Sequence, residues 1–301
     1  MEPTPGHVRA NDLDFAYLEL GTGPLALCLH GFPDSAHGWR HQLPALAEAG
    51  YRAVAPWMRG YAPTAIPADG CYQQGALAAD ANALHEALGA DGDAVLIGHD
   101  WGATAVYPAV NAEPGRWRAM VAAAVPHPAA MAGMILDYEQ LKRSFYMFVF
   151  QHPLAEVIVQ QGDLAFIDRL WADWSPGLDE AVAATAVQQV KESLREPENL
   201  TAALGYYRAT IGGVGLDPRY DEIQAAGGQP VTIPALYLHG ADDGCIGVGF
   251  AEAGAGFLTH ERSRTVIVDD AGHFLQLEQP ERVNAEILDF LQGLGRDEVT
   301  A

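Results

Sequence analysis

The sequence predicts an α/β fold in which a mostly parallel, doubly wound sheet is interrupted by a helical insertion. Short and almost wholly apolar runs recur along the chain, as expected of parallel strands that helices cover on both faces. Longer helical patterns separate these runs. Between about residues 128 and 228 the patterns are helical only, with no apolar strand among them.

The elements are expected in the following order. An edge hairpin over 8–23 precedes apolar runs that predict six strands, at 24–32, 51–60, 93–100, 118–126, 235–243 and 264–270. Capping residues, Ala and Leu content, Pro280 and terminal glycines predict helices at 35–50, 75–90 and 281–295. The insertion follows the strand at 118–126, the sixth when the two strands of the hairpin are counted. We therefore expect a core of 1–127 and 229–301 and a helical cap of 128–228.

Composition and charge limit the class of protein. The 301 residues suit one large α/β domain with a smaller insertion, and 49% hydrophobic with 19% charged residues excludes a disordered chain. The net charge of −22 would repel nucleic acid and anionic membrane surfaces, so neither is an expected partner. We expect a monomer or a homodimer.

The cysteines and the N-terminal residues indicate whether the protein has disulfides or a metal site, and in which compartment it is expected. Cys28, Cys71 and Cys245 are odd in number, scattered and without a C-x-x-C pair, so we predict neither a disulfide framework nor a metal site. Residues 1–15 lack the basic and apolar regions of a secretory signal, and no apolar run is long enough to span a bilayer. These features favour a cytoplasmic protein.

The stretch "GHDWG" at 98–102 has the frame of a nucleophile elbow, with aspartate at its centre. Gly98 and Gly102 permit a sharp strand-to-helix turn and close packing of the helix on the strand. The helix N-terminus stabilises the carboxylate of Asp100. The alternative is that Asp100 only caps the helix. A candidate base, a candidate acid and a candidate oxyanion hole elsewhere in the sequence favour a nucleophile.

A carboxylate nucleophile can attack an sp³ carbon and form an ester, which a base-activated water must then hydrolyse. His273 follows the last predicted strand in "AGHF" and is the candidate base. Asp243 and its neighbour Asp242, after the preceding strand, are candidate acids to orient it. The loop "LHGFPD" at 29–34 predicts an oxyanion hole made by the N–H groups of Phe32 and Trp101.

Together these motifs resemble the epoxide hydrolases of the α/β-hydrolase superfamily over nearly the full length. The segments that fit are "HGFPD" at 30–34, "RGY" at 59–61, "GHDWG", the late acid and "AGHF". The resemblance implies the α/β-hydrolase fold with a cap and the order nucleophile, acid, histidine. It favours Asp243 over Asp242, because the family's acid usually lies three residues after the strand-end glycine, here Gly240.

The resemblance also implies two cap tyrosines that hydrogen-bond the epoxide oxygen. One is Tyr146, four residues before Phe150 in "SFYMFVFQ", and the other is Tyr207, directly before an arginine. Its neighbour Tyr206 is expected to be a packing residue. A phenol with a pKa of roughly 10 stays neutral and can protonate the alkoxide that forms on ring opening.

The expected reaction is hydrolysis of a small-molecule epoxide to a vicinal diol through an aspartyl ester, with water as the second substrate and no cofactor. A hydrolytic dehalogenase, acting on haloalkanes or haloacids with the same triad, is the alternative. The chain departs from the epoxide hydrolase pattern at "RGYAPT" and after "FQ", which leaves the identity of the epoxide open. Phe145, Phe148, Trp171 and Trp174 suggest an apolar pocket, and packing within a helical core explains the same residues equally well.

Overall fold

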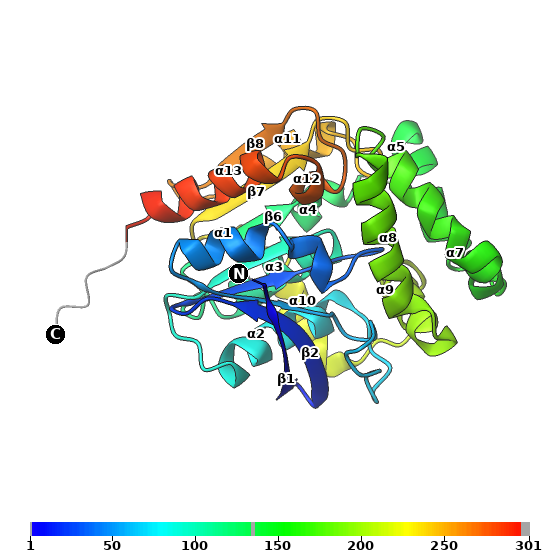
Figure 1. Ribbon diagram of the computed structural model, residues 1–301, viewed down its shortest axis with the longest axis horizontal. Coiled ribbons are helices and arrows are strands. Elements are labelled where there is room, and N and C mark those ends of the chain that lie inside the picture. The colour runs from blue at the N-terminus through cyan, green and yellow to red at the C-terminus, as the bar shows by residue number, and fades with distance from the viewer. Residues whose placement is uncertain (1, 134–135, 296–301) are drawn as a thin grey trace.

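The computed structural model describes residues 2–133 and 136–295 and places one eight-stranded sheet at its centre (Figure 1). The strand order is β1-β2-β4-β3-β5-β6-β7-β8. Only the pairs β1–β2 and β2–β4 are antiparallel. The strands are β1 (Thr4–Ala10), β2 (Leu13–Leu20), β3 (Leu25–Leu29), β4 (Arg52–Pro56), β5 (Val95–His99), β6 (Ala119–Ala123), β7 (Ala235–Gly240) and β8 (Arg264–Val268).

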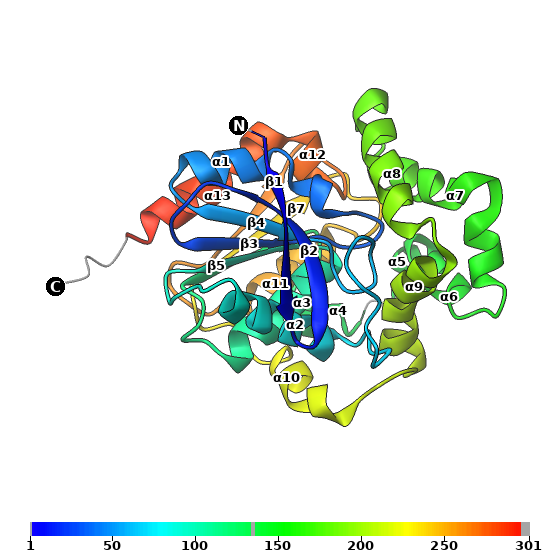
Figure 2. The ribbon, with the colours of Figure 1, turned by 60° about the horizontal axis from the view of Figure 1, so that its bottom comes forward.

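Helices cover both faces of the sheet, which is why its central strands are mostly apolar. All residues of β3, β5, β6 and β7 are buried. On one face α1 (Gln42–Glu48) packs with α13 (Pro280–Gly293), and on the other α2 (Gln74–Ala87) packs with α3 (Trp101–Ala112) (Figure 2). This arrangement confirms the doubly wound sheet expected from the alternation of strands and helices.

The edge hairpin has a tight turn at Asn11 and Asp12, whose φ values of 45° and 59° suit residues that tolerate the left-handed region. The helix expected over 35–50 is broken into a 3-10 turn, η1 (Ala36–Trp39), and α1. Pro44 explains the break. It lies in the first turn of α1, whereas a continuous helix would place it in the interior, where its missing N–H costs a hydrogen bond.

The connection from β6 to β7 is helical, as expected. Its helices are α4 (Pro128–Met131), α5 (Tyr138–Arg143), α6 (Phe145–Val149), α7 (Ala155–Trp174), α8 (Glu180–Leu194), α9 (Pro197–Gly212) and α10 (Asp221–Ala226), with the 3-10 turn η3 (Pro218–Tyr220). Left-handed residues 162–164 interrupt α7. Helices α5 to α9 lie beside the carboxyl ends of the parallel strands (Figure 2).

Two short helices of this connection, α10 and α4, pack on α-helices of the core. α10 packs on α2 and α3, and α4 packs on α11 (Gly249–Ala255), which follows β7. A short helix, α12 (Leu275–Glu278), directly follows His273. The division into a core of 1–127 and 229–301 and a cap of 128–228 therefore remains a prediction. Among the described residues, no helix has the length and apolar character needed to cross a membrane.

Candidate active site

Asp100 lies at the turn between β5 and α3 in a strained backbone conformation, with φ 53° and ψ −116°. A positive φ at a residue other than glycine costs about 1–3 kcal/mol and is concentrated at functional sites. The flanking glycines allow the turn. A Cβ on Gly98 would lie 2.3 Å from the carbonyl oxygen of Gly102, and one on Gly102 would lie 2.0 Å from that of Leu29. The elbow therefore requires glycine at both positions.

The loop after β3 approaches the Asp100 carboxylate with its backbone. The N–H of Phe32 donates a hydrogen bond to Asp100 Oδ1 at 2.7 Å. A Cβ on Gly31 would lie 2.2 Å from Asp100 Oδ1 and 2.6 Å from the nitrogen of Trp101. Of the two amides expected to form an oxyanion hole, that of Phe32 thus binds the carboxylate, and glycine at position 31 permits the close approach.

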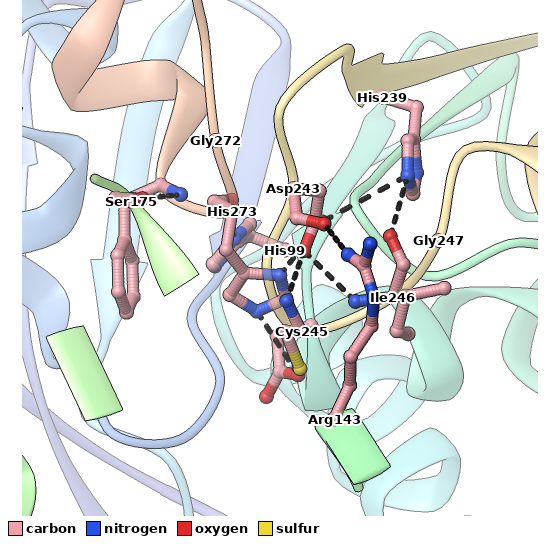
Figure 3. Close-up of polar contacts among 12 residues, drawn as sticks. His99, Arg143, Ser175, His239, Asp243, Cys245, Ile246, Gly247, Gly272 and His273 are labelled. Carbon is pink, nitrogen blue, oxygen red and sulfur yellow. Dashed lines mark hydrogen bonds and ion pairs between the residues drawn. The ribbon is translucent and has the colours of Figure 1, made fainter. Parts of the chain in front are cut away.

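His273 lies between the carboxylates of Asp243 and Asp100. Figure 3 shows His273 facing Asp243. Its Nδ1 is 2.9 Å from Asp243 Oδ2, and its Nε2 is 3.4 Å from Asp100 Oδ2. Asp243 is buried, whereas Asp242, the alternative acid, is exposed. The structure therefore brings Asp243 to the histidine, in the relative positions of a nucleophile–histidine–acid triad.

Backbone amides also hold Asp243. Its Oδ1 accepts hydrogen bonds from the N–H groups of Cys245 and Ile246 at 2.7 and 2.9 Å. Burial alone would raise the pKa of Asp243, but His273 and these hydrogen bonds outweigh it and lower the pKa. Asp243 is thus a fixed anion that orients His273.

The pKa of His273 is raised to about 10. Burial opposes the charged imidazolium, but the carboxylates of Asp243 and Asp100 outweigh it. The resting site therefore holds an imidazolium between two carboxylates. Loss of the charge on Asp100 would lower the pKa of His273 and make the imidazole a better base.

Tyr146 of α6 and Tyr207 of α9 meet above the nucleophile, with ring centroids 5.5 Å apart. Both are buried, and burial is the largest cause that raises their pKa values well above the usual 10, so both phenols are neutral donors. Among the described residues, Tyr207 Oη and His273 Nε2 are buried without a hydrogen-bond partner. Tyr206 donates to the Arg59 carbonyl at 2.8 Å, as a packing residue does.

A cavity of about 490 Å³ opens beside Asp100 and both tyrosines. The other lining residues are mainly apolar, and none is a lysine or arginine: Gln74, Trp101, Thr104, Val125, Pro126, Pro128, Met131, Ala132, Ser144, Met147, Phe148, Thr210, Ile211 and Ile246. Of the four aromatics expected to line the pocket, only Phe148 does so. Phe145 is 45% exposed and does not line the cavity.

The two tryptophans, both in α7, pack behind the site instead. Trp171 stacks on Phe274 with centroids 3.6 Å apart, and its indole N–H donates to the Pro33 carbonyl at 2.8 Å. Trp174 packs on His273, and its carbonyl accepts the N–H groups of both His273 and Gly244 at 3.0 Å. The sequence did not reveal these contacts, because the spacing of residues along a helix does not distinguish a side chain that lines a pocket from one that packs on neighbouring loops.

Two further histidines are structural. Met58 N–H donates to His30 Nε2 at 2.9 Å, and His99 Nε2 lies 2.8 Å from the His273 carbonyl oxygen, which accepts its proton. Burial is the main cause that lowers both pKa values, to about 4, so both rings are neutral. His99 thereby supports the backbone of His273.

One cluster of donors at the site has the composition of a metal centre. Asp243, Cys245 and His273 offer ligand atoms within 4.8 Å of one another. Both oxygens of Asp243 are, however, already hydrogen-bonded to His273 and the loop backbone. A metal would have to break the hydrogen bond between Asp243 and His273, so this cluster is poorly suited to hold a metal ion. All three cysteines are free and buried.

Comparison with known proteins shows the family to which the chain belongs. A family model described as the alpha/beta hydrolase fold matches residues 24–280. The chain belongs to the α/β-hydrolase family. The hydrolase is 31% identical to epoxide hydrolase A of Mycobacterium tuberculosis, over 97% of this chain and 98% of that protein. It is 30% identical to epoxide hydrolase 3 of Xenopus tropicalis, over 95% of this chain and 77% of that protein.

Comparison with a solved structure also shows similarity to an epoxide hydrolase. The hydrolase matches epoxide hydrolase A from Mycobacterium thermoresistibile with a TM-score of 0.79 and 29% identity, over 97% of this chain and 98% of that one. The resemblance to epoxide hydrolases stated from the motifs is therefore confirmed, as is the fold class.

Proposed function

We propose that the hydrolase converts a small apolar epoxide to a vicinal diol through a covalent ester on Asp100. The observation that carries this proposal is that one apolar cavity is lined by a carboxylate at a nucleophile elbow and by two buried phenols. A carboxylate opens an epoxide only if the departing oxygen receives a proton, and two neutral phenols supply donors for it. The names of the relatives support the same substrate.

In the first step, an Asp100 carboxylate oxygen attacks one ring carbon. The carbon–oxygen bond of the ring breaks, and the oxygen takes a proton from Tyr146 or Tyr207. The product is a hydroxyalkyl ester, and the tyrosine regains its proton from the imidazolium of His273 or from solvent. Uncharged phenols suit this step, because they stabilise charge only as it develops on the oxygen.

In the second step, water hydrolyses the ester. Esterification removes the charge of Asp100, one of the causes that raise the pKa of His273. The neutral imidazole, oriented by Asp243, takes a proton from water, and the hydroxide attacks the ester carbonyl carbon. The amides of Phe32 and Trp101 stabilise the oxyanion, the imidazolium returns the proton to the leaving alkoxide, and the diol departs.

The two tyrosines have a testable effect. Each single substitution, Tyr146→Phe or Tyr207→Phe, should slow ester formation by about 10–1000-fold, the loss expected for one transition-state hydrogen bond. The double variant should lose nearly all ring opening. Hydrolysis of an ester already formed should hardly change, because it uses His273 and the amides. Single-turnover kinetics separates the steps, and normal ester formation in the double variant would exclude the epoxide reaction.

The two steps should depend on pH differently. Ester hydrolysis needs neutral His273, so its rate should rise with pH through the pKa of the esterified enzyme, which lies below about 10 because Asp100 has lost its charge. Ester formation does not need a neutral imidazole and should stay flat over this range. Quenched samples weighed by mass spectrometry should show more ester at lower pH. An ester fraction that grows with pH would contradict the assignment of the base.

Dehalogenation is the competing reaction, and one feature favours it. The indole N–H of Trp101, beside the nucleophile, is buried without a hydrogen-bond partner among the described residues and could stabilise a departing halide. Haloacids fit poorly, because the cavity lining has no lysine or arginine to pair with their carboxylate. Matched terminal epoxides and haloalkanes decide between the two reactions. We expect diol from the epoxides, and halide release without diol would overturn the proposal.

A further inference from the structure

One buried glutamine of the cap is bonded to the loop that carries the triad acid. Gln140 of α5 is 2% exposed, and both ends of its carboxamide are used. Its Nε2 donates to the Cys245 carbonyl at 2.8 Å, and its Oε1 accepts the N–H of Gly247 at 2.9 Å. Nε2 also donates to Ser144 Oγ at 2.9 Å. The side chain therefore joins α5 to residues more than 100 positions away.

On the core side, these bonds fix the backbone that holds Asp243. The carboxylate accepts the N–H groups of Cys245 and Ile246. Gln140 binds the carbonyl of the peptide that carries the Ile246 N–H, and it accepts the N–H of the next peptide, that of Gly247. The Arg143 guanidinium, one turn further along α5, donates to the Asp243 carbonyl oxygen, and Figure 3 shows Arg143 beside this loop. The direction in which Asp243 meets His273 thus depends on a cap helix.

On the cap side, the same amide fixes the helix that carries Tyr146. Ser144, which accepts from Gln140, directly precedes α6. The phenol Oη of Tyr146 lies 3.4 Å from the Sγ of Cys245, whose carbonyl Gln140 holds. A closed ring of contacts therefore runs from Gln140 through Ser144, Tyr146 and Cys245 back to Gln140.

We propose that Gln140 is a positioning residue that couples the two half-reactions, by holding Tyr146 for ring opening and Asp243 for ester hydrolysis. The inference rests on the proposed function, which defines these two steps. Gln140 touches neither substrate nor the reacting atoms. A buried amide with both its donor and its acceptor satisfied is costly to disturb, because its removal leaves buried backbone groups unpaired.

The test is the rate of each step in Gln140→Met, which keeps the length of the side chain and removes its hydrogen bonds. Ester formation and ester hydrolysis should each slow by about tenfold, the effect of losing one or two buried hydrogen bonds. Rapid quenching followed by intact-mass measurement gives both rate constants. The amplitude of ester formation reports the folded fraction, which separates slower chemistry from a loss of folded protein.

Gln151→Met is the matched control. Gln151 is a second cap glutamine, and its Nε2 donates to the carbonyls of Met147 and Tyr207 at 3.0 and 3.1 Å. It has no hydrogen bond to the loop of Asp243 among those of the described residues. We expect Gln151→Met to slow ester formation only, while Gln140→Met slows both steps.

Gln140→Glu is a second variant that keeps the acceptor for Gly247 N–H and loses the donor to Cys245. It should slow both steps. In the uncharged Gln140→Met variant, a less firmly held Asp243 should also move the pH midpoint of ester hydrolysis to lower values. The inference is overturned if the Gln140 variants slow only one step or neither while the wild type turns over. A wild type that forms no ester with any epoxide instead overturns the proposed function and, with it, this inference.

Discussion

Asp100→Asn should abolish diol formation, lowering the rate by at least about a thousandfold while the fold survives. An amide of the same shape fills the same space at the elbow but is a very poor nucleophile. Diol release is measured by chromatography, and circular dichroism compares the folded state with the wild type. Intact mass must exclude deamidation, which would regenerate aspartate.

Asp242→Asn is the matched control for this substitution. Asp242 is exposed one residue before the triad acid and should be replaceable with little change in rate. An Asp100→Asn enzyme that keeps its activity, with asparagine verified at position 100, would remove Asp100 from the nucleophile role. Loss of activity in Asp242→Asn together with normal activity in Asp243→Asn would show that the orienting acid is misassigned.

His273→Gln should separate the half-reactions completely. Ester formation does not use the histidine as a base, so the enzyme should alkylate itself once and then stop. Intact mass should rise by the mass of one epoxide, and peptide mapping should place the adduct on Asp100. Steady turnover should fall by about a thousandfold or more, because no group remains to activate water.

The control for this variant is His7→Gln, on strand β1 at the far edge of the sheet, which should turn over normally without a lasting adduct. An adduct on another residue would relocate the nucleophile. A His273→Gln enzyme with normal turnover and no adduct would show that the imidazole is not the base for hydrolysis.

The parts of the fold that sequence predicted well are those set by local pattern. Apolar runs located every parallel strand, because strands that helices cover on both faces are mostly apolar. The frame around Asp100 pointed to an elbow, because only glycine tolerates the approach of backbone atoms at 98 and 102. The break before α1 was missed, although Pro44 is the local signal that could have revealed it.

The parts that sequence could not predict depend on contacts between distant segments. Asp242 and Asp243 are adjacent, and only the fold shows which one turns toward His273. Trp171 and Trp174 have the spacing of pocket-lining residues but clamp the loops behind the site. Gln140 belongs to no sequence motif. Its proposed role depends on hydrogen bonds to backbone groups of Cys245 and Gly247, which only the folded chain brings close to it.

The most direct test of the central claim follows the oxygen of water through a single turnover. The hydrolase, in excess over epoxide, reacts once in water enriched in ¹⁸O, and the diol and the Asp100 peptide are weighed separately. If water attacks the ester carbonyl carbon, the new diol oxygen comes from the unlabelled Asp100 carboxylate, and ¹⁸O appears in Asp100. A first-turnover diol that carries ¹⁸O, with Asp100 unlabelled, would show that water opens the epoxide directly and would contradict the covalent mechanism.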